Sequence, residues 1–130
     1  MIDDEPLIGT LIARLLSEAH DVTSLTNARH GLLLLAKDDP FDVVLCDLLM
    51  PGMNGSAFFT QLAQRSPAIA NGVVFMTGGA CTAELRDFVQ RVPNIVLEKP
   101  LDFGRLEMLV DRRVRARPKL RGTGTHERRL

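Results

Sequence analysis

Short apolar runs that end in polar or turn-forming residues alternate with helix-like segments along this chain. The apolar runs cover residues 22–25, 43–46, 73–76 and 95–97, and helical patterns separate them. Strands that alternate with helices predict a parallel sheet with helices on both faces. Right-handed crossovers favour the strand order 2-1-3-4-5. We therefore expect an α/β three-layer αβα sandwich around a five-stranded parallel sheet.

The helical segments carry their own start signals and apolar stripes. Pro6 suits a first helical turn, and an apolar stripe of leucines follows it at helical spacing. Asn27 and Asp102 are suited to cap the helices that follow them. The expected inward residues are Leu7, Leu11, Leu15 and Leu16 in the first helix, Phe58, Phe59 and Leu62 in 55–65, Leu85, Phe88, Val89 and Val92 in the next, and Phe103, Leu106, Leu109 and Val110 in the last.

The first strand is unusually short in this scheme. It occupies the central position of the sheet, yet only Met1 and Ile2 precede Asp3. A central strand usually needs about five residues. We expect a truncated first strand and a less stable domain.

Charge divides the chain into two parts. Residues 1–111 hold 8 Lys/Arg and 15 Asp/Glu, a balance of −7, whereas residues 112–130 hold 8 Lys/Arg and 1 acid, a balance of +7. The second part is poor in apolar residues, which is typical of disordered segments. We expect a folded domain over residues 1–114 and a basic, disordered tail over residues 115–130. The sequence has no run of about 20 apolar residues, which a membrane helix needs. Cys46 and Cys81 are expected to be reduced thiols.

Polar side chains follow the predicted strands. Asp3 and Asp4 follow the first, Asp47 follows the run 43–46, Thr77 follows 73–76, and Lys99 comes shortly after 95–97. In a parallel sheet these strand ends meet at one edge, where ligands bind. Three neighbouring carboxylates repel one another unless a cation is present, and Mg²⁺ prefers such hard oxygen ligands.

This group of residues suits phosphoryl transfer. Asp47 can act as a nucleophile that forms an aspartyl phosphate. The transfer then needs mainly positioning and charge neutralisation, from Mg²⁺ on one side and Lys99 on another. The hydroxyl of Thr77 can donate to a phosphoryl oxygen, and Gly78 and Gly79 offer backbone N–H groups.

Four motifs in order resemble the receiver domain of two-component response regulators, a flavodoxin-like fold. They are Asp-Asp-Glu-Pro at residues 3–6, Leu-Cys-Asp-Leu-Leu-Met-Pro-Gly-Met-Asn-Gly at 45–55, Phe-Met-Thr-Gly-Gly at 75–79 and Glu-Lys-Pro-Leu at 98–101. The resemblance covers residues 1 to about 114. It implies a cytoplasmic signalling module rather than an enzyme, phosphorylated by a histidine kinase or a histidine phosphotransfer protein. Neither membrane nor nucleic acid is expected as a partner, and a homodimer is left open.

The resemblance also implies a role for each site residue. Asp47 is the phosphoacceptor, Asp4 binds Mg²⁺ directly, Asp3 binds it through water, and Leu49 offers its backbone carbonyl to the metal. It further assigns Thr77 as the switch hydroxyl, Gly78 and Lys99 as phosphate-binding groups, and a cis bond between Lys99 and Pro100.

The sequence departs from this family pattern beside the site. Val96 stands three residues before Lys99, where many receivers with an output domain carry Tyr or Phe, and the chain has no Tyr. Leu49 and Gly79 offer no polar side chain to a hydrolytic water. The missing aromatic residue resembles receivers attached to hybrid histidine kinases or acting in phosphorelays.

Two other classes of function remain as alternatives. A small aspartate-nucleophile phosphohydrolase shares strand-end Asp, Thr and Lys groups, but it usually needs Asp-x-Asp, and Leu49 occupies the second position. A degenerate receiver that only binds proteins is disfavoured by the intact acids, Thr77 and Lys99. His20, His30 and His126 have no acidic or Cys neighbour at ligand spacing and are expected to be solvated.

Overall fold

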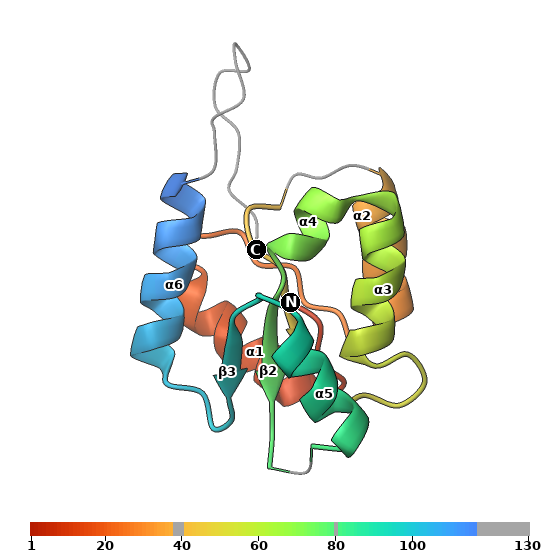
Figure 1. The fold of residues 1–130 in the computed structure, drawn as a ribbon. Helices are drawn as coiled ribbons and strands as arrows, with labels where there is room; N and C mark the ends of the chain where they lie inside the picture. Colours follow the sequence, from red (N-terminus) through yellow and green to blue (C-terminus); the bar gives the residue numbers. More distant parts are fainter. Residues whose placement is uncertain (38–40, 80, 117–130) are drawn as a thin grey trace.

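The computed structural model describes residues 1–37, 41–79 and 81–116 of the 130-residue chain. Helices and strands alternate along it, and helices pack on both faces of a small parallel sheet (Figure 1). The elements are α1 (Pro6–Leu16), α2 (Ala28–Lys37), β1 (Leu45–Asp47), α3 (Gly55–Arg65), α4 (Pro67–Asn71), β2 (Val74–Thr77), α5 (Ala83–Arg91), β3 (Val96–Glu98) and α6 (Phe103–Ala116).

The sheet has the predicted parallel arrangement. β1, β2 and β3 pair in that order, with Cys46 opposite Phe75 and Phe75 opposite Val96. Ile2 forms parallel bridges to both Leu25 and Cys46. Five extended segments thus lie in an order compatible with 2-1-3-4-5, although the first two contribute bridges rather than strands. The predicted α/β architecture with a parallel sheet between helices is confirmed.

Apolar side chains form a cluster on each face of the sheet. One cluster joins α2, α3 and α5 to the sheet, and its rings of Phe59, Phe75 and Phe88 meet edge to face at centroid distances of 5.3–6.0 Å. The other cluster joins α1 and α6, through Ile12 and Val110, to the opposite face. Each residue of β1 and most of β2 is buried, as expected for strands covered on both sides.

The inward faces of α1 and α6 differ in part from the predicted ones. In α1 the buried residues are Gly9, Ile12 and Leu16, whereas Leu7 and Leu11 are 66% and 40% exposed. The prediction is therefore wrong at Leu7 and Leu11, but it is confirmed at Leu16, which is buried beside Ile12, and Leu15 is partly buried against the same cluster. In α6, Phe103 is 42% exposed, and Leu106, Val110 and Val114 form the buried stripe.

His20 is not solvated, which corrects the expectation from the sequence. Its side chain is only 5% exposed, and its Nε2 lies 2.8 Å from Oδ1 of Asp111 in α6. Nδ1 is buried without a hydrogen-bond partner. The pair was not recognisable in the sequence because its members are 91 positions apart.

The remaining differences concern element boundaries. The short helix α4 was not predicted, and α6 continues to Ala116, two residues into the segment expected to be a tail. Residues 117–130, and with them His126, lie outside the described residues. Across the described ranges, both cysteines are free thiols and no helix is long and apolar enough to span a membrane.

Candidate functional site

Backbone pairing brings the predicted site residues to one edge of the sheet. The amide of Asp47 donates to the carbonyl of Ile2 at 2.9 Å, which places Asp3 beside the end of β1. The amide of Lys99 donates to the carbonyl of Thr77 at 2.7 Å, which ties the residue after β3 to the end of β2. The predicted convergence at the carboxyl ends of the strands is therefore present.

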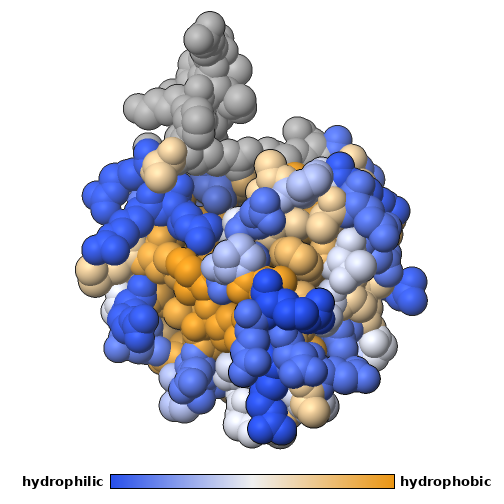
Figure 2. Space-filling model, in the orientation of Figure 1, coloured by the Kyte–Doolittle hydropathy of each residue, from blue (hydrophilic) through white to orange (hydrophobic). Residues whose placement is uncertain are grey.

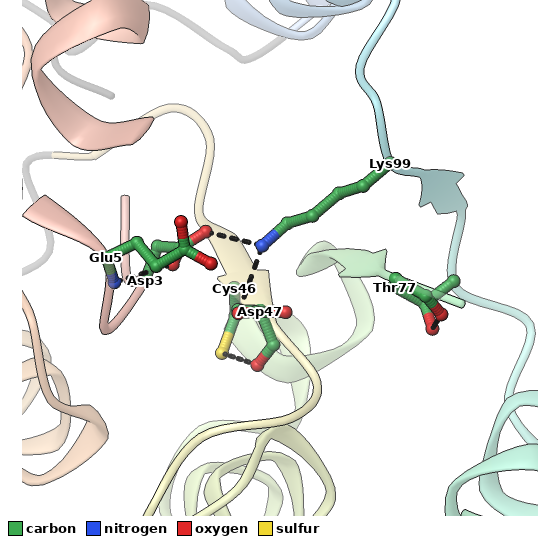
Figure 3. Close-up of polar contacts among 7 residues, drawn as sticks. Asp3, Glu5, Cys46, Asp47, Thr77 and Lys99 are labelled. Carbon is green, nitrogen blue, oxygen red and sulfur yellow. Dashed lines mark hydrogen bonds and ion pairs between the residues drawn. The ribbon is translucent and has the colours of Figure 1, made fainter. Parts of the chain in front are cut away.

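Lys99 bridges two carboxylates at this edge. Its Nζ lies 2.9 Å from Oδ2 of Asp3 and 3.1 Å from Oδ2 of Asp47. Figure 3 shows the lysine side chain reaching from β3 across to both acids. The two acids are almost fully buried, and Oδ1 of Asp3 also accepts the amide of Glu5 at 2.9 Å. Within the described part of the chain, Oδ1 of Asp47 accepts no hydrogen bond.

The electrostatic balance at this edge is negative. Burial and the neighbouring charges of Asp3 and Asp4 raise the pKa of Asp47, although Lys99 opposes the shift. Partial burial acts to lower the pKa of Lys99, but its hydrogen bonds to Asp3 and Asp47 raise it overall. The single positive charge of Lys99 therefore faces three acids, and it does not fully offset the burial and repulsion that disfavour the ionised form of Asp47.

The three acids fit a divalent cation. Asp3, Asp4 and Asp47 each place an oxygen within 4.8 Å of the others. Asp4 and Asp47 line a cavity of about 490 Å³, together with Leu49 and Lys99, whereas the buried Asp3 is not part of this lining. Hard, closely spaced carboxylate oxygens beside an open cavity are the donor set that Mg²⁺ uses.

Thr77 and the glycines after it form another wall of this cavity. The Thr77 hydroxyl donates to the carbonyl of Gly78 at 3.3 Å and is turned away from Asp47 (Figure 3). A Cβ added at Gly78 or Gly79 would meet no atom within 4 Å, so both residues keep this wall open. The Lys99–Pro100 peptide bond is cis.

The loop after β1 contains a positioning residue that was recognised only as part of a motif. A Cβ on Gly55 would lie 2.8 Å from the carbonyl oxygen of Asp47 and 2.9 Å from Cα of Leu48. The Gly55 amide also donates to the carbonyl of Leu48 at 2.9 Å. Gly52 has a φ of 74°, which glycine adopts readily. The glycine spacing of the motif contained this signal, but the close backbone contact required the structure.

Known proteins resemble this chain in sequence and in fold. The sequence model described as "Response regulator receiver domain" matches residues 1–111. The DNA-binding transcriptional regulator NtrC of Salmonella typhimurium is 32% identical over 115 residues, which cover 88% of this chain and 24% of NtrC. The nitrate/nitrite response regulator protein NarL of Escherichia coli is 39% identical over 69 residues, which cover 51% of this chain and 32% of NarL.

Solved structures support the same fold. The receiver domain of NtrX from Brucella abortus has a TM-score of 0.73 at 24% identity and covers 89% of this chain and 97% of that domain. A receiver domain protein from Clostridium thermocellum has a TM-score of 0.75 at 22% identity, with coverages of 88% and 90%. The chain spans a third or less of the length of the curated relatives named above. Its sequence match and its fold together place it in the family of response regulator receiver domains, to which this chain belongs.

Proposed function

We propose that Asp47 accepts a phosphoryl group and that this transfer switches the conformation of the domain. The observation that carries the proposal is the Lys99 bridge, which holds a cation 3.1 Å from Asp47, an acid on the cavity wall whose Oδ1 accepts no hydrogen bond from the described residues. Receiver domains act as signalling modules with histidine kinases or phosphotransfer proteins, so a phosphohistidine is the expected donor. Small acyl phosphates offer the same phosphoryl group.

The transfer forms one bond and breaks another. An oxygen of the ionised Asp47 attacks phosphorus, while the P–N bond of phosphohistidine, or the P–O bond of an acyl phosphate, breaks and its electron pair leaves with the donor. Lys99 stays next to the charge that this step adds, and Gly78 and Gly79 line the same cavity. Positioning and charge neutralisation are the main requirements of phosphoryl transfer.

Asp4, Asp47 and the carbonyl of Leu49 would hold Mg²⁺, with Asp3 acting through water. When bound, Mg²⁺ would neutralise charge on the acids and on the phosphoryl oxygens. The placement of Asp4 on the cavity wall, with Asp3 outside this lining, supports this division of roles. Asp3 would also orient Lys99, to which it is hydrogen-bonded.

The switch would begin at Thr77. Its hydroxyl now donates to Gly78, and the new phosphoryl oxygens offer a stronger, charged acceptor. Movement of Thr77 toward Asp47 would pull the segment that leads into α5. Val96 in β3 has no aromatic ring to follow this movement, and attachment to a hybrid kinase or a phosphorelay stays a prediction.

The experiment is intact-mass measurement after incubation with acetyl phosphate and Mg²⁺. Wild type should gain the mass of one phosphoryl group, and Asp47→Asn should gain none. Asp42→Asn, which removes an acid from the same β1 region but outside the site, is the matched control and should react like wild type. Equal modification of wild type and Asp47→Asn would refute the proposed acceptor.

The mass measurement, together with an assay of phosphate release from small phosphate esters, separates the alternatives. A degenerate receiver would remain unmodified under all conditions, whereas a phosphohydrolase would release phosphate catalytically from small phosphate esters. Leu49, which stands where such a hydrolase carries its second Asp, is apolar and 47% exposed. This favours phosphoryl acceptance over ester hydrolysis.

A further inference from the structure

Arginines gather at the edge of the sheet opposite the acceptor site. The strands are parallel, so each helix that follows a strand runs back and ends at the edge where the strands begin. Figure 1 shows the carboxyl-terminal ends of α3 and α6 at this edge, with α4 between them. Three segments meet there, and they contain five arginines, which we call the basic patch: Arg65 in 65–73, Arg91 in 91–97, and Arg112, Arg113 and Arg115 in 112–116.

Polar contacts fasten these three segments to one another. Nη1 of Arg113 donates to the carbonyl of Gly72 at 2.8 Å, which ties the last turn of α6 to the turn after α4. The buried amide of Asn94 donates to the carbonyls of Ala70 and Val73 at 2.9 and 2.7 Å, which ties the loop after α5 to the same turn. The basic patch therefore stands on one connected surface rather than on three separate helix ends.

The positive charge of the patch has no acidic counterpart. The three segments contain no Asp, Glu or Lys, and every arginine of the patch except the half-buried Arg113 is exposed. None of the five forms an ion pair with an acid of the described residues, and Asp111, next to Arg112, lies 2.8 Å from His20 instead. A helix dipole favours a cation in a last turn, but it does not require neighbouring helix ends to exclude acids together. The patch thus carries charge of one sign, which suits an anionic partner.

The kind of cation in the patch favours a phosphodiester backbone as that anion. All five cations are guanidinium groups, whose planar fork can donate two hydrogen bonds to one phosphate. The sequence continues from the patch with Arg117, Lys119 and Arg121 and has no acid before Glu127. A run of cations matches a polymer of regularly spaced phosphates, which in a duplex carries one charge for about every 1.7 Å of axis.

Two features of the described segments narrow the partner further. They expose one large apolar side chain, Ile95 at 40%, whereas helices that lie on a membrane surface insert a whole apolar face. Figure 2 shows hydrophilic surface over the carboxyl-terminal end of α6, and the apolar surface in this view lies away from it, between α6 and α5. The segments contain no aromatic residue, so the patch lacks the stacking platforms that hold single strands.

We propose that the basic patch binds the phosphodiester backbone of double-stranded nucleic acid without sequence preference. A nucleic-acid partner was not expected from the sequence, where these arginines are scattered along the chain and meet only in the fold. The site goes beyond the proposed phosphoryl transfer and does not depend on it, because the acceptor cavity lies at the other edge of the sheet.

The test is fluorescence anisotropy of a short labelled DNA duplex titrated with the full chain. The duplex should bind with a Kd of about 10⁻⁵–10⁻⁴ M at low salt, within the range of non-specific contacts. The affinity should fall by roughly two orders of magnitude between about 50 and 200 mM salt, as expected for about four phosphate contacts. A duplex of another sequence should bind equally, and a single strand of the same length should bind no more tightly.

A variant with three charges removed locates the site. Arg65→Gln, Arg91→Gln and Arg112→Gln in one chain should weaken binding at least about tenfold at low salt and reduce the salt slope by about 3, one for each lost phosphate contact. The three side chains are exposed, so thermal unfolding should show a folded protein.

The matched control removes the same net charge elsewhere. Arg29→Gln, Arg86→Gln and Arg105→Gln replace exposed arginines near the beginnings of α2, α5 and α6, toward the acceptor edge. This variant should keep the affinity within about twofold of wild type and keep the salt slope, because it leaves the patch contacts unchanged.

Equal binding by wild type and the patch variant would overturn the proposal. Loss of all binding in an Arg117→Gln, Lys119→Gln, Arg121→Gln variant, with the patch variant unaffected, would assign the binding to the tail alone. Tighter binding to phosphatidylglycerol vesicles than to the duplex would assign the patch to a membrane surface. Self-association that the patch variant abolishes, in a chain that does not bind the duplex, would assign it to a second copy.

Discussion

Lys99 determines the charge balance of the site because it is shared between two buried acids. Its 2.9 and 3.1 Å contacts are to Asp3 and Asp47, and among the described residues no cation pairs with Asp4. The two aspartates that adjoin in sequence therefore have different environments. Asp3 is a paired, buried carboxylate, and Asp4 is an unpaired one on the cavity wall.

This difference gives the first prediction. Asp4→Asn should weaken Mg²⁺ binding more than Asp3→Asn, because only Asp4 faces the cavity. In the metal-free protein, Asp4→Asn should raise the free energy of unfolding by up to about 1 kcal/mol through relief of repulsion. Asp3→Asn should lower it by about 1–3 kcal/mol, because Lys99 loses a charged partner.

Calorimetric Mg²⁺ titration and urea unfolding of both variants test this prediction. Glu18→Gln, at an exposed acid that does not line the cavity, provides the control and should change neither quantity strongly. An Asp4→Asn protein with wild-type Mg²⁺ affinity would contradict the assignment of Asp4 as a direct ligand.

Among the structural elements, the loop between β1 and α3 fixes the position of the acceptor. Gly55 begins α3 directly against the backbone of Asp47 and Leu48. Asn54 caps the helix by accepting the amide of Ala57 at 2.9 Å. The acceptor backbone thus lies between the sheet and the first turn of a capped helix.

The second prediction follows from this contact. Gly55→Ala should destabilise the protein by about 1–3 kcal/mol, because its Cβ would overlap backbone atoms that cannot rotate away. It should also slow modification of Asp47 by acetyl phosphate, since relief of the overlap displaces the acceptor. Thermal unfolding and intact-mass time courses measure the two effects.

Gly104→Ala is the matched control. Its Cβ would meet only Oδ1 of Asp102, at 3.4 Å, and alanine is the better helix former by about 1 kcal/mol. This variant should keep or gain stability and react at the wild-type rate. A Gly55→Ala protein that behaves like Gly104→Ala would show that the contact has no structural importance.

The sequence predicted these elements best where local signals and burial agree. The helix over 55–65 was predicted with its observed bounds, and the caps at Asn27 and Asp102 are present. Leu7 and Leu11 were assigned to the core wrongly, because two adjacent faces of this short helix are equally apolar. Tertiary packing buries the face that carries Ile12 and Leu16.

The site was predictable for a different reason. Asp3, Asp4, Asp47, Thr77 and Lys99 each stand at or just beyond the carboxyl end of an extended segment, and parallel topology alone brings such positions together. The Lys99 bridge to Asp3 and the His20–Asp111 pair were not predictable. They depend on side-chain reach between distant elements, which no local pattern encodes.

For the whole molecule, the amino terminus is part of the sheet rather than a free end. The Met1 amine donates to the carbonyl of Thr23 at 2.8 Å, and the Leu25 amide donates to the carbonyl of Met1 at 2.8 Å. Burial lowers the pKa of this amine to about 6. The charged form is therefore less favourable in the folded protein than in the unfolded chain.

The third prediction concerns the pH dependence of stability. In a chain that begins with a free amine at Met1, the folded pKa of about 6 lies below the unfolded value of 8.0. Above pH 8 the amine is neutral in both states, so it does not affect stability. Below pH 6 it is charged in both states, and the full cost of burying the charged amine applies. This group should therefore lower the free energy of unfolding by up to about 3 kcal/mol as pH falls across that window.

Urea unfolding between pH 5.5 and 8.5 measures this effect. An N-terminally acetylated chain retains every other titratable group and should lose this component of the pH dependence. Identical profiles for the free and acetylated chains would show that the buried amine does not contribute.

The fourth prediction concerns the extent of the switch. On addition of beryllofluoride with Mg²⁺, large amide shifts outside the ligand-binding residues around Asp4 and Asp47 should be confined to residues 77–79 and 81–91, with smaller ones in α6. Val96 carries no ring that would transmit the movement through β3. Two-dimensional NMR tests this, and shifts centred on α6 would contradict it.

Helices α6 and α5 differ in the number of polar side-chain contacts that tie them to the rest of the domain. Asp111 holds His20 at 2.8 Å, and Nη1 of Arg113 donates to the carbonyl of Gly72 at 2.8 Å, so α6 is fastened to the segment after α1 and to the turn before β2. No side chain of α5 makes such a polar contact with another described element. Polar side-chain contacts therefore hold α6 in place, whereas α5 lacks them. A conformational change that starts at Asp47 would displace α5, and α6 would keep its position relative to the sheet.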